Sequence, residues 1–360
     1  MTMSNAFGES LAKTRTRYIA TLGPASSNME AMEKLILAGV TMFRNNFAHA
    51  QYDEYRGRVQ MLKELNAKLG TNVLMQADIQ GTNIRVGMLP PEGKVELMEG
   101  HSYVCVTNGG ELADGEIPIN DDHLHTEVKV GEPFTFADGA IEGTITAVDG
   151  HRITVEVINS GILKQRKSIN VPETELNRSC ITDKDKKDLD FLINDAGVDW
   201  LALSFVANAA EIEEVRQLIG DKPIKIMSKM ERKKAIDNMY EIMKASDAVM
   251  IARGDLGIEI PMEEVPIISK QMIAMAHQLE TPVVTATQMM LSMVHSTRPT
   301  RAEVSDVANA IFDRSDAVML SEETAEGAHP DLALATMVKI ARRVEDYMYG
   351  RPNFFQQFEK

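Results

Sequence analysis

Short apolar runs recur along the chain, and each is followed by a stretch with the residue spacing of a helix. Eight of these runs are predicted strands, and they cover residues 18–23, 40–47, 72–78, 198–205, 224–229, 247–254, 282–288 and 316–323. Buried parallel strands are apolar throughout, and strands that alternate with helices are joined by right-handed crossovers. Eight such units predict an α/β fold in which the strands close into a (β/α)8 TIM barrel.

Two of the intervening helices have clear boundary signals. Thr300 is a candidate N-cap with Glu303 three positions later, which is the spacing of a capping box. A second helix is expected to begin at Thr182 and to stop at Gly197, because a glycine often ends a helix. Both signals support the alternation of strands with helices.

The long interval between the third and fourth predicted strands has a different pattern. Segments such as "HRITVEVINSG" alternate polar and apolar residues and end on glycines, as antiparallel strands do. We interpret residues 88–172 as a small all-β domain inserted after strand 3, and residues 1–87 and 173–360 as the barrel. Active sites of such barrels lie at the carboxyl ends of the strands, where we expect the insertion to act as a lid.

Composition and charge narrow the class of protein. The 360 residues are 44% hydrophobic, enough for a large core, and the formal net charge of −15 argues against nucleic acid and anionic membranes as partners. An anionic small molecule in a locally basic pocket stays compatible with this charge. No apolar run is long enough to span a bilayer and the N-terminus lacks the pattern of a signal peptide, so a cytoplasmic location is expected.

The cysteines and the C-terminus add two expectations. Cys105 and Cys180 lack the spacing of metal ligands and are expected to be ordinary thiols. The aromatic residues of the C-terminal "FFQQFEK" fit either a contact with a partner subunit or a frayed end. A homo-oligomer is expected.

Polar residues follow most of the predicted strands at their carboxyl ends, where a barrel enzyme places its chemistry. They are Arg44, Asn46, His49, Asp78, Arg85, Ser204, Lys229, Glu231, Arg253, Asp255 and Thr287. Glu231 and Asp255 are carboxylates on neighbouring predicted strands, beside a lysine and several arginines. This combination suits a divalent cation that carries an anionic, oxygen-rich substrate.

Each of these residues also has a simpler interpretation. Glu231 lies in the charged run "KMERKK", which by itself is typical of an exposed helix start. Thr287 can serve as a helix cap ahead of methionines that belong to the core, and the glycines around Asp255 can serve a tight turn. The site is favoured because unrelated surface residues are not expected to gather at the same end of successive strands.

The segments "SKMERKKAI", "SDAVMIARGDLGIEIP", "ATQMMLSM" and "RPTRAEVSDVANAIFDRSDAVMLSEETAEG" carry a specific resemblance. Together with "YIATLGPAS", "FRNNFAHA" and "ADIQGTNIRVG", which contains Arg85, they resemble the pyruvate kinase family. The similarity runs from about Arg17 to Val344. It implies a (β/α)8 barrel with a β lid domain inserted after strand 3, in agreement with the pattern of the chain.

The resemblance implies a role for each matching residue of the substrate half-site. Glu231 and Asp255 match carboxylates that bind Mg2+ or Mn2+, through which phosphoenolpyruvate is gathered. Lys229 matches a lysine that faces the phosphoryl group during transfer, where a fixed positive charge stabilises the transition state. Arg44 and Ser204 match residues that contact the phosphate.

Further roles are implied in the same way. Thr287 matches a threonine that helps to protonate the enolate, and the amides of Gly254 and Asp255 are implied to bind the substrate carboxylate. The nucleotide contacts are implied to be Pro24, His49 and, from the lid, Lys167. Closure of the lid is expected to bring Lys167 and Asp138 over the cleft and to exclude water.

The chain departs from the family pattern at the monovalent-cation site. Asn46 and Asp78 match two of its side chains, but Ala48 replaces a serine. Asn83 stands where the family has glutamate in potassium-dependent members or lysine in independent ones, and Thr82 replaces a proline. Dependence on K+ is therefore left open.

The nucleotide half-site departs as well. Glu326 replaces a lysine that approaches the nucleotide, and Ala137 replaces the first of two aspartates in the lid, of which Asp138 is kept. These changes leave open whether ADP is the acceptor. Other departures are Glu322, Arg314 and Leu291. The C-terminal domain of the family has no counterpart before Lys360, so allosteric control through that domain is not expected.

Three functions are therefore weighed. The first is Mg2+-dependent phosphoryl transfer from phosphoenolpyruvate to a nucleoside diphosphate, which yields pyruvate and a nucleoside triphosphate. The second keeps the metal and the enolate but uses another acceptor or bond, as a lyase, decarboxylase or phosphotransferase would, and is motivated by Glu326 and Ala137. The third is a regulatory protein without catalysis.

Overall fold

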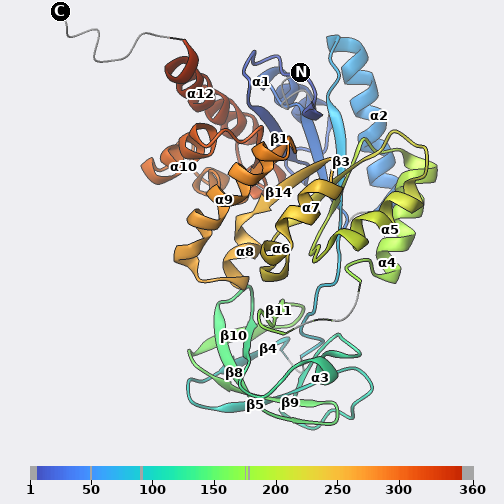
Figure 1. Cartoon of the computed structure of the whole chain (residues 1–360), viewed down its shortest axis with the longest axis vertical. Coiled ribbons are helices and arrows are strands. Elements are labelled where there is room, and N and C mark those ends of the chain that lie inside the picture. Colours follow the sequence, from blue (N-terminus) through green and yellow to red (C-terminus); the bar gives the residue numbers. More distant parts are fainter. Residues whose placement is uncertain (1–5, 49–50, 90–91, 175, 177–178, 351–360) are drawn as a thin grey trace, which may run out of the picture. The chain divides into compact units, whose positions relative to one another are not determined.

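A computed structural model of the protein describes residues 6–48, 51–89, 92–174, 176 and 179–350. The chain divides into two compact units. The first comprises Met1–Gly81, Ile181–Gly254 and Pro266–Lys360, and the second comprises Thr82–Cys180 and Asp255–Val265. Figure 1 follows the chain through both.

The first unit is a closed barrel of parallel strands, as the apolar runs predict. Its strands, in the order in which they pair around the barrel, are β1 (Arg17–Thr21), β16 (Ala317–Leu320), β15 (Val283–Ala286), β14 (Ala248–Ala252), β13 (Lys225–Met230), β12 (Trp200–Leu203), β3 (Leu74–Ile79) and β2 (Met42–Asn46). Several strands end earlier than predicted, because residues such as Phe205 and Thr287 have left-handed φ angles of 60° and 68° that leave the ladder.

Helices connect the strands and surround the barrel (Figure 1). They are α1 (Met29–Ala38), α2 (Tyr52–Leu69), α4 (Asp183–Phe191), α5 (Ala209–Ile219), α6 (Lys233–Asp237), α7 (Met239–Ala245), α9 (Val265–Gln278), α10 (Arg301–Phe312), α11 (Glu322–Ala325) and α12 (Pro330–Tyr349). Another short helix, α8 (Arg253–Glu259), follows β14. Among the helices of the described ranges, none combines the length and the apolarity needed to cross a bilayer.

The predicted helix boundaries are confirmed at both places where they were specific. Thr300 caps α10 in a capping box with Glu303, and Thr182 caps α4 in a capping box with Asp185. After α4 the chain continues as a π-helical turn, Leu192–Ala196, and stops at Gly197. Local capping chemistry therefore fixes where these helices begin.

Apolar side chains fill the inside of the barrel. Met42, Met227, Met250 and Met319 belong to one buried cluster with Trp200 and several alanines. Large and small residues thus interdigitate in the interior, as in other barrels of this type. These packed side chains hold in place the strands whose carboxyl ends carry the candidate site residues.

Aspartates before three strands fix the strand register at the opposite, amino-terminal end. Asp199, Asp247 and Asp316 each precede a strand, and the carboxylate of each accepts a hydrogen bond from an amide at the start of the neighbouring strand. The bonds run from Met75 N (2.7 Å), Ile226 N (2.8 Å) and Val283 N (3.0 Å). Burial raises the pKa of Asp199 and of Asp316. These residues stabilise the barrel away from the site.

The second unit consists mainly of β structure around a core of its own. A six-stranded sheet has the order β11 (Ile169–Asn170), β7 (Pro133–Phe136), β8 (Ile141–Asp149), β9 (Arg152–Val157), β5 (Ser102–Val106) and β6 (Ile117–Pro118), and a two-stranded sheet pairs β10 (Gly161–Lys164) with β4 (Lys94–Leu97). Two details differ from an antiparallel all-β domain: β5 and β6 are parallel, and a single helical turn, α3 (Leu124–Glu127), is present.

Candidate active site

Arg44 and Asp78 form an ion pair across neighbouring strands near their carboxyl ends. Nε of Arg44 on β2 lies 2.7 Å from Oδ2 of Asp78 on β3, and Nη1 of Arg44 donates to Oγ1 of Thr21 on β1 at 3.1 Å. The other carboxylate oxygen of Asp78 accepts a hydrogen bond from Nε2 of Gln76 at 2.6 Å. The guanidinium of Arg44 is therefore held in one orientation from two sides.

Asn46 and Asp78 are the side chains predicted for a monovalent cation. Asp78 already accepts hydrogen bonds through both carboxylate oxygens, and Oδ1 of Asn46 accepts one from the amide of Ala48 at 3.0 Å. The oxygens of this pair are thus engaged by donors of the protein itself.

Lys229 extends the same cluster to the next strands. Its Nζ donates to Oγ of Ser204 at 3.0 Å, lies 3.0 Å from Oε2 of Glu231 and lies 4.0 Å from Oδ2 of Asp78. The lysine is only 8% exposed. A polar network thus crosses β1, β2, β3 and β13 and the residue after β12, and it brings together Arg44, Asp78, Ser204, Lys229 and Glu231.

Glu231 is the most deeply placed member of this cluster. It is 0% exposed, so the interpretation of "KMERKK" as an exposed helix start is wrong for this residue. Its Oε1 accepts a hydrogen bond from the amide of Phe205, at the left-handed turn that ends β12. Burying two cations and two carboxylates is less favourable than apolar packing of the same volume, so the cluster is better explained by chemistry than by stability.

Thr287 and Gly254 meet at the ends of β15 and β14. Oγ1 of Thr287 accepts a hydrogen bond from the amide of Gly254 at 2.8 Å and donates to the carbonyl of Ala286 at 2.7 Å. Thr287 is therefore not a helix cap, since the next helical turn is preceded by Met290. The predicted core role of the methionines is confirmed, because Met290 and its neighbours Met289 and Met293 are fully buried.

The segment that contains Asp255 begins with a fixed arginine. Arg253 makes a two-pronged ion pair with Asp306 of α10, with both N–O distances at 2.6 Å. Asp255 follows in the first turn of α8, where the chain passes from the first unit to the second. The amide of Gly254, which the resemblance assigns to the substrate carboxylate, donates to Thr287.

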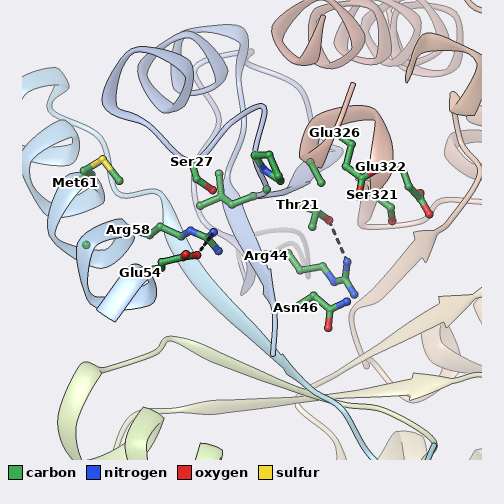
Figure 2. Close-up of a pocket in the computed structure, with 15 residues that line it drawn as sticks. Thr21, Ser27, Arg44, Asn46, Glu54, Arg58, Met61, Ser321, Glu322 and Glu326 are labelled. Atoms are coloured by element: carbon green, nitrogen blue, oxygen red, sulfur yellow. Dashed lines mark hydrogen bonds and ion pairs between the residues drawn. The ribbon is translucent and has the colours of Figure 1, made fainter. Parts of the chain in front are cut away.

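A cavity of about 860 Å3 opens in the first unit beside Arg44. Pro24, Arg44 and Asn46 line it, as expected for a site at the strand ends, together with apolar groups and the acidic residues Glu322 and Glu326. In Figure 2, Glu322 and Glu326 enter from one side, with Thr21 and Arg44 toward the middle. His49, predicted to contact the nucleotide, lies outside the described residues.

One helix face that lines this cavity was missed by the sequence analysis. Glu54, Gly57, Arg58 and Met61 of α2 all border the cavity. Their spacing of i, i+3, i+4 and i+7 is that of a single helix face, and a glycine in the middle of a long helix was an available signal. Burial lowers the pKa of Arg58, and Glu54 acts in the opposite direction.

The remaining predicted residues lie in the second unit. Nη1 of Arg85 donates to the carbonyl of Arg166 at 2.9 Å, and the carbonyl of Lys167 accepts a hydrogen bond from the amide of Val86. Asp138 has a left-handed φ of 59° and accepts a 2.5 Å hydrogen bond from Oγ of Ser168. Backbone and side-chain bonds thus hold all three within this unit.

The residues at the strand ends fit a divalent cation that arrives with its substrate. Among the described residues, no group of three or more histidine, cysteine, aspartate or glutamate side chains is arranged to hold a metal ion alone. Glu231 has carboxylate oxygens, the ligands that Mg2+ prefers; Oε1 accepts from the Phe205 amide and Oε2 faces Lys229, so a bound cation would share these oxygens with those donors. Mg2+ usually completes its shell with substrate oxygens and water. This donor set fits Mg2+ bound jointly by protein and substrate.

Comparisons with known proteins identify relatives of this chain. The chain is 44% identical over 336 residues to pyruvate kinase 2 of Synechocystis, and this match covers 92% of the chain and 57% of the relative. A pyruvate kinase of Agrobacterium vitis is 41% identical, with 94% of the chain and 71% of the relative covered. The chain thus spans little more than half the length of the Synechocystis relative.

The structural comparison and the family model identify the same family. A crystal structure of a pyruvate kinase from Cryptosporidium parvum superposes with a TM-score of 0.87 at 36% identity and covers 92% of this chain and 69% of that one. The family described as "Pyruvate kinase, barrel domain" matches residues 13–334. With the barrel, the inserted β unit and the cluster around Lys229 in place, the chain belongs to the pyruvate kinase family.

Proposed function

We propose that this chain catalyses Mg2+-dependent transfer of the phosphoryl group of phosphoenolpyruvate to a nucleoside diphosphate, giving pyruvate and a nucleoside triphosphate. The observation that carries the proposal is the buried cluster in which Lys229 contacts Ser204 and Glu231 beside the Arg44–Asp78 ion pair. The family and the named activities of the relatives support it.

The cations of this cluster suit a phosphoryl group in transfer. A loose transition state spreads negative charge over the oxygens of that group, and catalysis consists mainly of positioning and charge stabilisation. Lys229 and Arg44 are held in place by neighbours before any ligand arrives, so little reorganisation is needed when charge develops. Ser204 orients the ammonium of Lys229 and offers a hydroxyl to the phosphate.

Glu231 and Asp255 would hold the divalent cation. When bound, Mg2+ supplies charge neutralisation and polarises the substrate oxygens. Thr287 would assist protonation of the released enolate; the support for this role is that its hydroxyl accepts from the Gly254 amide and donates to the Ala286 carbonyl and is thereby fixed in orientation. Its own proton is engaged by that carbonyl, so the proton delivered to the enolate would come from a water molecule that Thr287 positions.

Replacing Lys229 with Met tests the proposal. Loss of a preorganised charge at the transferring group should lower kcat by about a hundredfold to a thousandfold. Lys225→Met is a matched control, because Lys225 begins the same strand but is exposed. Its Nζ lies 5.3 Å from the centre of the Trp200 ring. Pyruvate formation is measured with Mg2+, phosphoenolpyruvate and ADP, GDP, CDP or UDP. A wild-type rate no higher than that of the Lys229→Met variant with all four acceptors would rule the proposal out.

A second function is favoured by the acidic side of the cavity. Glu322 and Glu326 place negative charge where a polyphosphate acceptor would lie. An enzyme that keeps the metal and the enolate but uses another acceptor would catalyse Mg2+-dependent proton exchange at the methyl group of pyruvate without nucleotide turnover. Exchange seen by NMR in D2O, in a protein that turns over none of the four diphosphates, separates this function from the first.

A further inference from the structure

The cavity face of α2 combines four features that ordinary helix packing does not require. One cavity is lined by a carboxylate (Glu54), an open stretch of backbone (Gly57), a fixed guanidinium (Arg58) and a thioether (Met61). In Figure 2, the side chains of Glu54 and Arg58 reach from the helix into the cavity. Each feature has a consequence for what can bind there.

Arg58 is held in position from behind. Its Nη1 donates to Oδ1 of Asn45 at 3.0 Å, and Asn45 is a β2 residue with 0% exposure. Its Nη2 lies 3.3 Å from Oε2 of Glu54, and the Arg58 side chain is 14% exposed. A guanidinium that is fixed by a buried amide keeps its remaining N–H groups for an acceptor in the cavity.

Glu54 is the more exposed partner of this ion pair. Its side chain is 63% exposed, and the bond to Arg58 involves only Oε2. A carboxylate has about four lone-pair directions and accepts two parallel N–H groups readily. Glu54 and Arg58 together therefore present adjacent acceptor and donor groups.

Gly57 leaves room beside these groups. A glycine inside a helix is unfavourable relative to alanine, and the φ of Gly57 is not left-handed. A Cβ built at Gly57 would meet no atom within 4 Å, so packing does not exclude a side chain there. The missing side chain widens the cavity, whose lining also includes the apolar residues Leu22 and Pro24.

A flat heterocycle with a polar edge matches this combination, because its faces can lie against apolar groups and its edge can reach Glu54 and Arg58. We infer that this face of α2 reads the base of the acceptor nucleotide and favours guanine over adenine, an inference that rests on the proposed function for the identity of the acceptor. Guanine offers two adjacent N–H donors to a carboxylate and a carbonyl oxygen to an arginine. Adenine places a lone pair at N1 toward the carboxylate instead.

Glu54→Gln is the central variant of the test. In the wild type, kcat/KM for GDP should exceed that for ADP by about tenfold, a moderate preference because the ion pair is partly solvated. Glu54→Gln should reduce this ratio to about threefold or less while the KM for phosphoenolpyruvate is unchanged. Glu64→Gln is the matched control, because Glu64 lies on the same helix and does not line the cavity.

Gly57→Leu tests the space for the ring. It should raise the KM for GDP and ADP alike by about tenfold or more without lowering the melting temperature, because leucine is the better helix former. An unchanged KM would contradict the assignment of this face to the base.

Equilibrium dialysis with GDP and ADP, without phosphoenolpyruvate, separates the two proposals. Turnover that is equal for all bases, or a Glu54→Gln variant that retains the preference for GDP, overturns the inference and leaves the proposed function standing. Guanine-selective binding that Glu54→Gln abolishes, without turnover of any acceptor, overturns the proposed function and supports the assignment of the base site.

Discussion

At the scale of single residues, Glu326 is expected to weaken the binding of an anionic acceptor. It lines the same cavity as Arg44 and Arg58, and the three glutamates of that lining outnumber the two arginines. A polyphosphate therefore enters a region whose formal charge is not positive. Glu326→Lys should lower the KM for a nucleoside diphosphate by about tenfold at low ionic strength, since like charges a few ångströms apart in water cost about 1 kcal/mol and the substitution also adds an attraction.

The salt dependence checks the cause of that change. The gain should shrink as ionic strength rises, because exposed charges are screened. Glu241→Lys makes the same change of net charge on the exposed surface of α7, away from the cavity, and should leave the KM unchanged. An equal drop of KM in both variants would assign the effect to the net charge of the protein.

At the scale of elements, a shared hydroxyl joins three parts of the second unit. Oγ1 of Thr107, after β5, lies 2.8 Å from Nδ1 of His125 on α3 and 3.0 Å from Nδ1 of His151, before β9. The two imidazole rings are 4.2 Å apart between centroids. If both rings were protonated, two positive charges would therefore lie next to each other.

This arrangement predicts that the second unit loses stability in mild acid. Burial, and then the charges of His151 and His123, lower the pKa of His125 from its ordinary value of 6.5, although Asp121 acts in the opposite direction. The unfolded chain therefore binds the proton more readily, and the stability that His125 contributes above pH 6.5 is lost as the pH falls below it. Thermal unfolding or hydrogen exchange of the second unit, measured between pH 7.5 and 5, should report this loss.

Two substitutions test whether His125 causes this loss of stability. His125→Asn keeps a hydrogen-bonding group for Thr107 but removes the titrating ring, so the fall of stability between pH 6.5 and 5 should be smaller than in the wild type. His101→Asn is the control, because His101 is exposed and its ring nitrogen Nδ1 lies 3.2 Å from the carbonyl oxygen of Glu99. If His125→Asn retained the full pH dependence, another group would be responsible.

The elements themselves were predictable, but the details of the site were not. Buried parallel strands are apolar throughout, which is why all eight barrel strands were found, and capping boxes fixed the starts of α4 and α10. The bonds from Lys229 to Ser204 and Glu231 depend on the register between strands, which short apolar runs do not specify. The cavity face of α2 was not predicted, because a glutamate followed by an arginine four positions later is also the usual pattern of an exposed ion pair on a helix.

At the scale of the whole molecule, each of the two units has a hydrophobic core among its described residues. Phe134 belongs to the cluster of the second unit and Met250 to the cluster inside the barrel, and both are fully buried. Each unit is compact in its internal contacts. The two units should therefore open as distinct cooperative units under native conditions.

A matched pair of core substitutions tests this expectation. Phe134→Ala should lower the free energy of unfolding of the second unit by about 3–5 kcal/mol, and Met250→Ala should lower that of the barrel by about 2–5 kcal/mol, because each removes buried apolar contacts and leaves a cavity. Hydrogen exchange followed by mass spectrometry should show faster exchange in β7, β8 and β9 for the first variant, with the barrel strands unchanged. If Phe134→Ala accelerated exchange in β13 and β14 to the same extent, the chain would unfold as one unit, and the pH effect of His125 would then reach the Lys229 cluster through global stability.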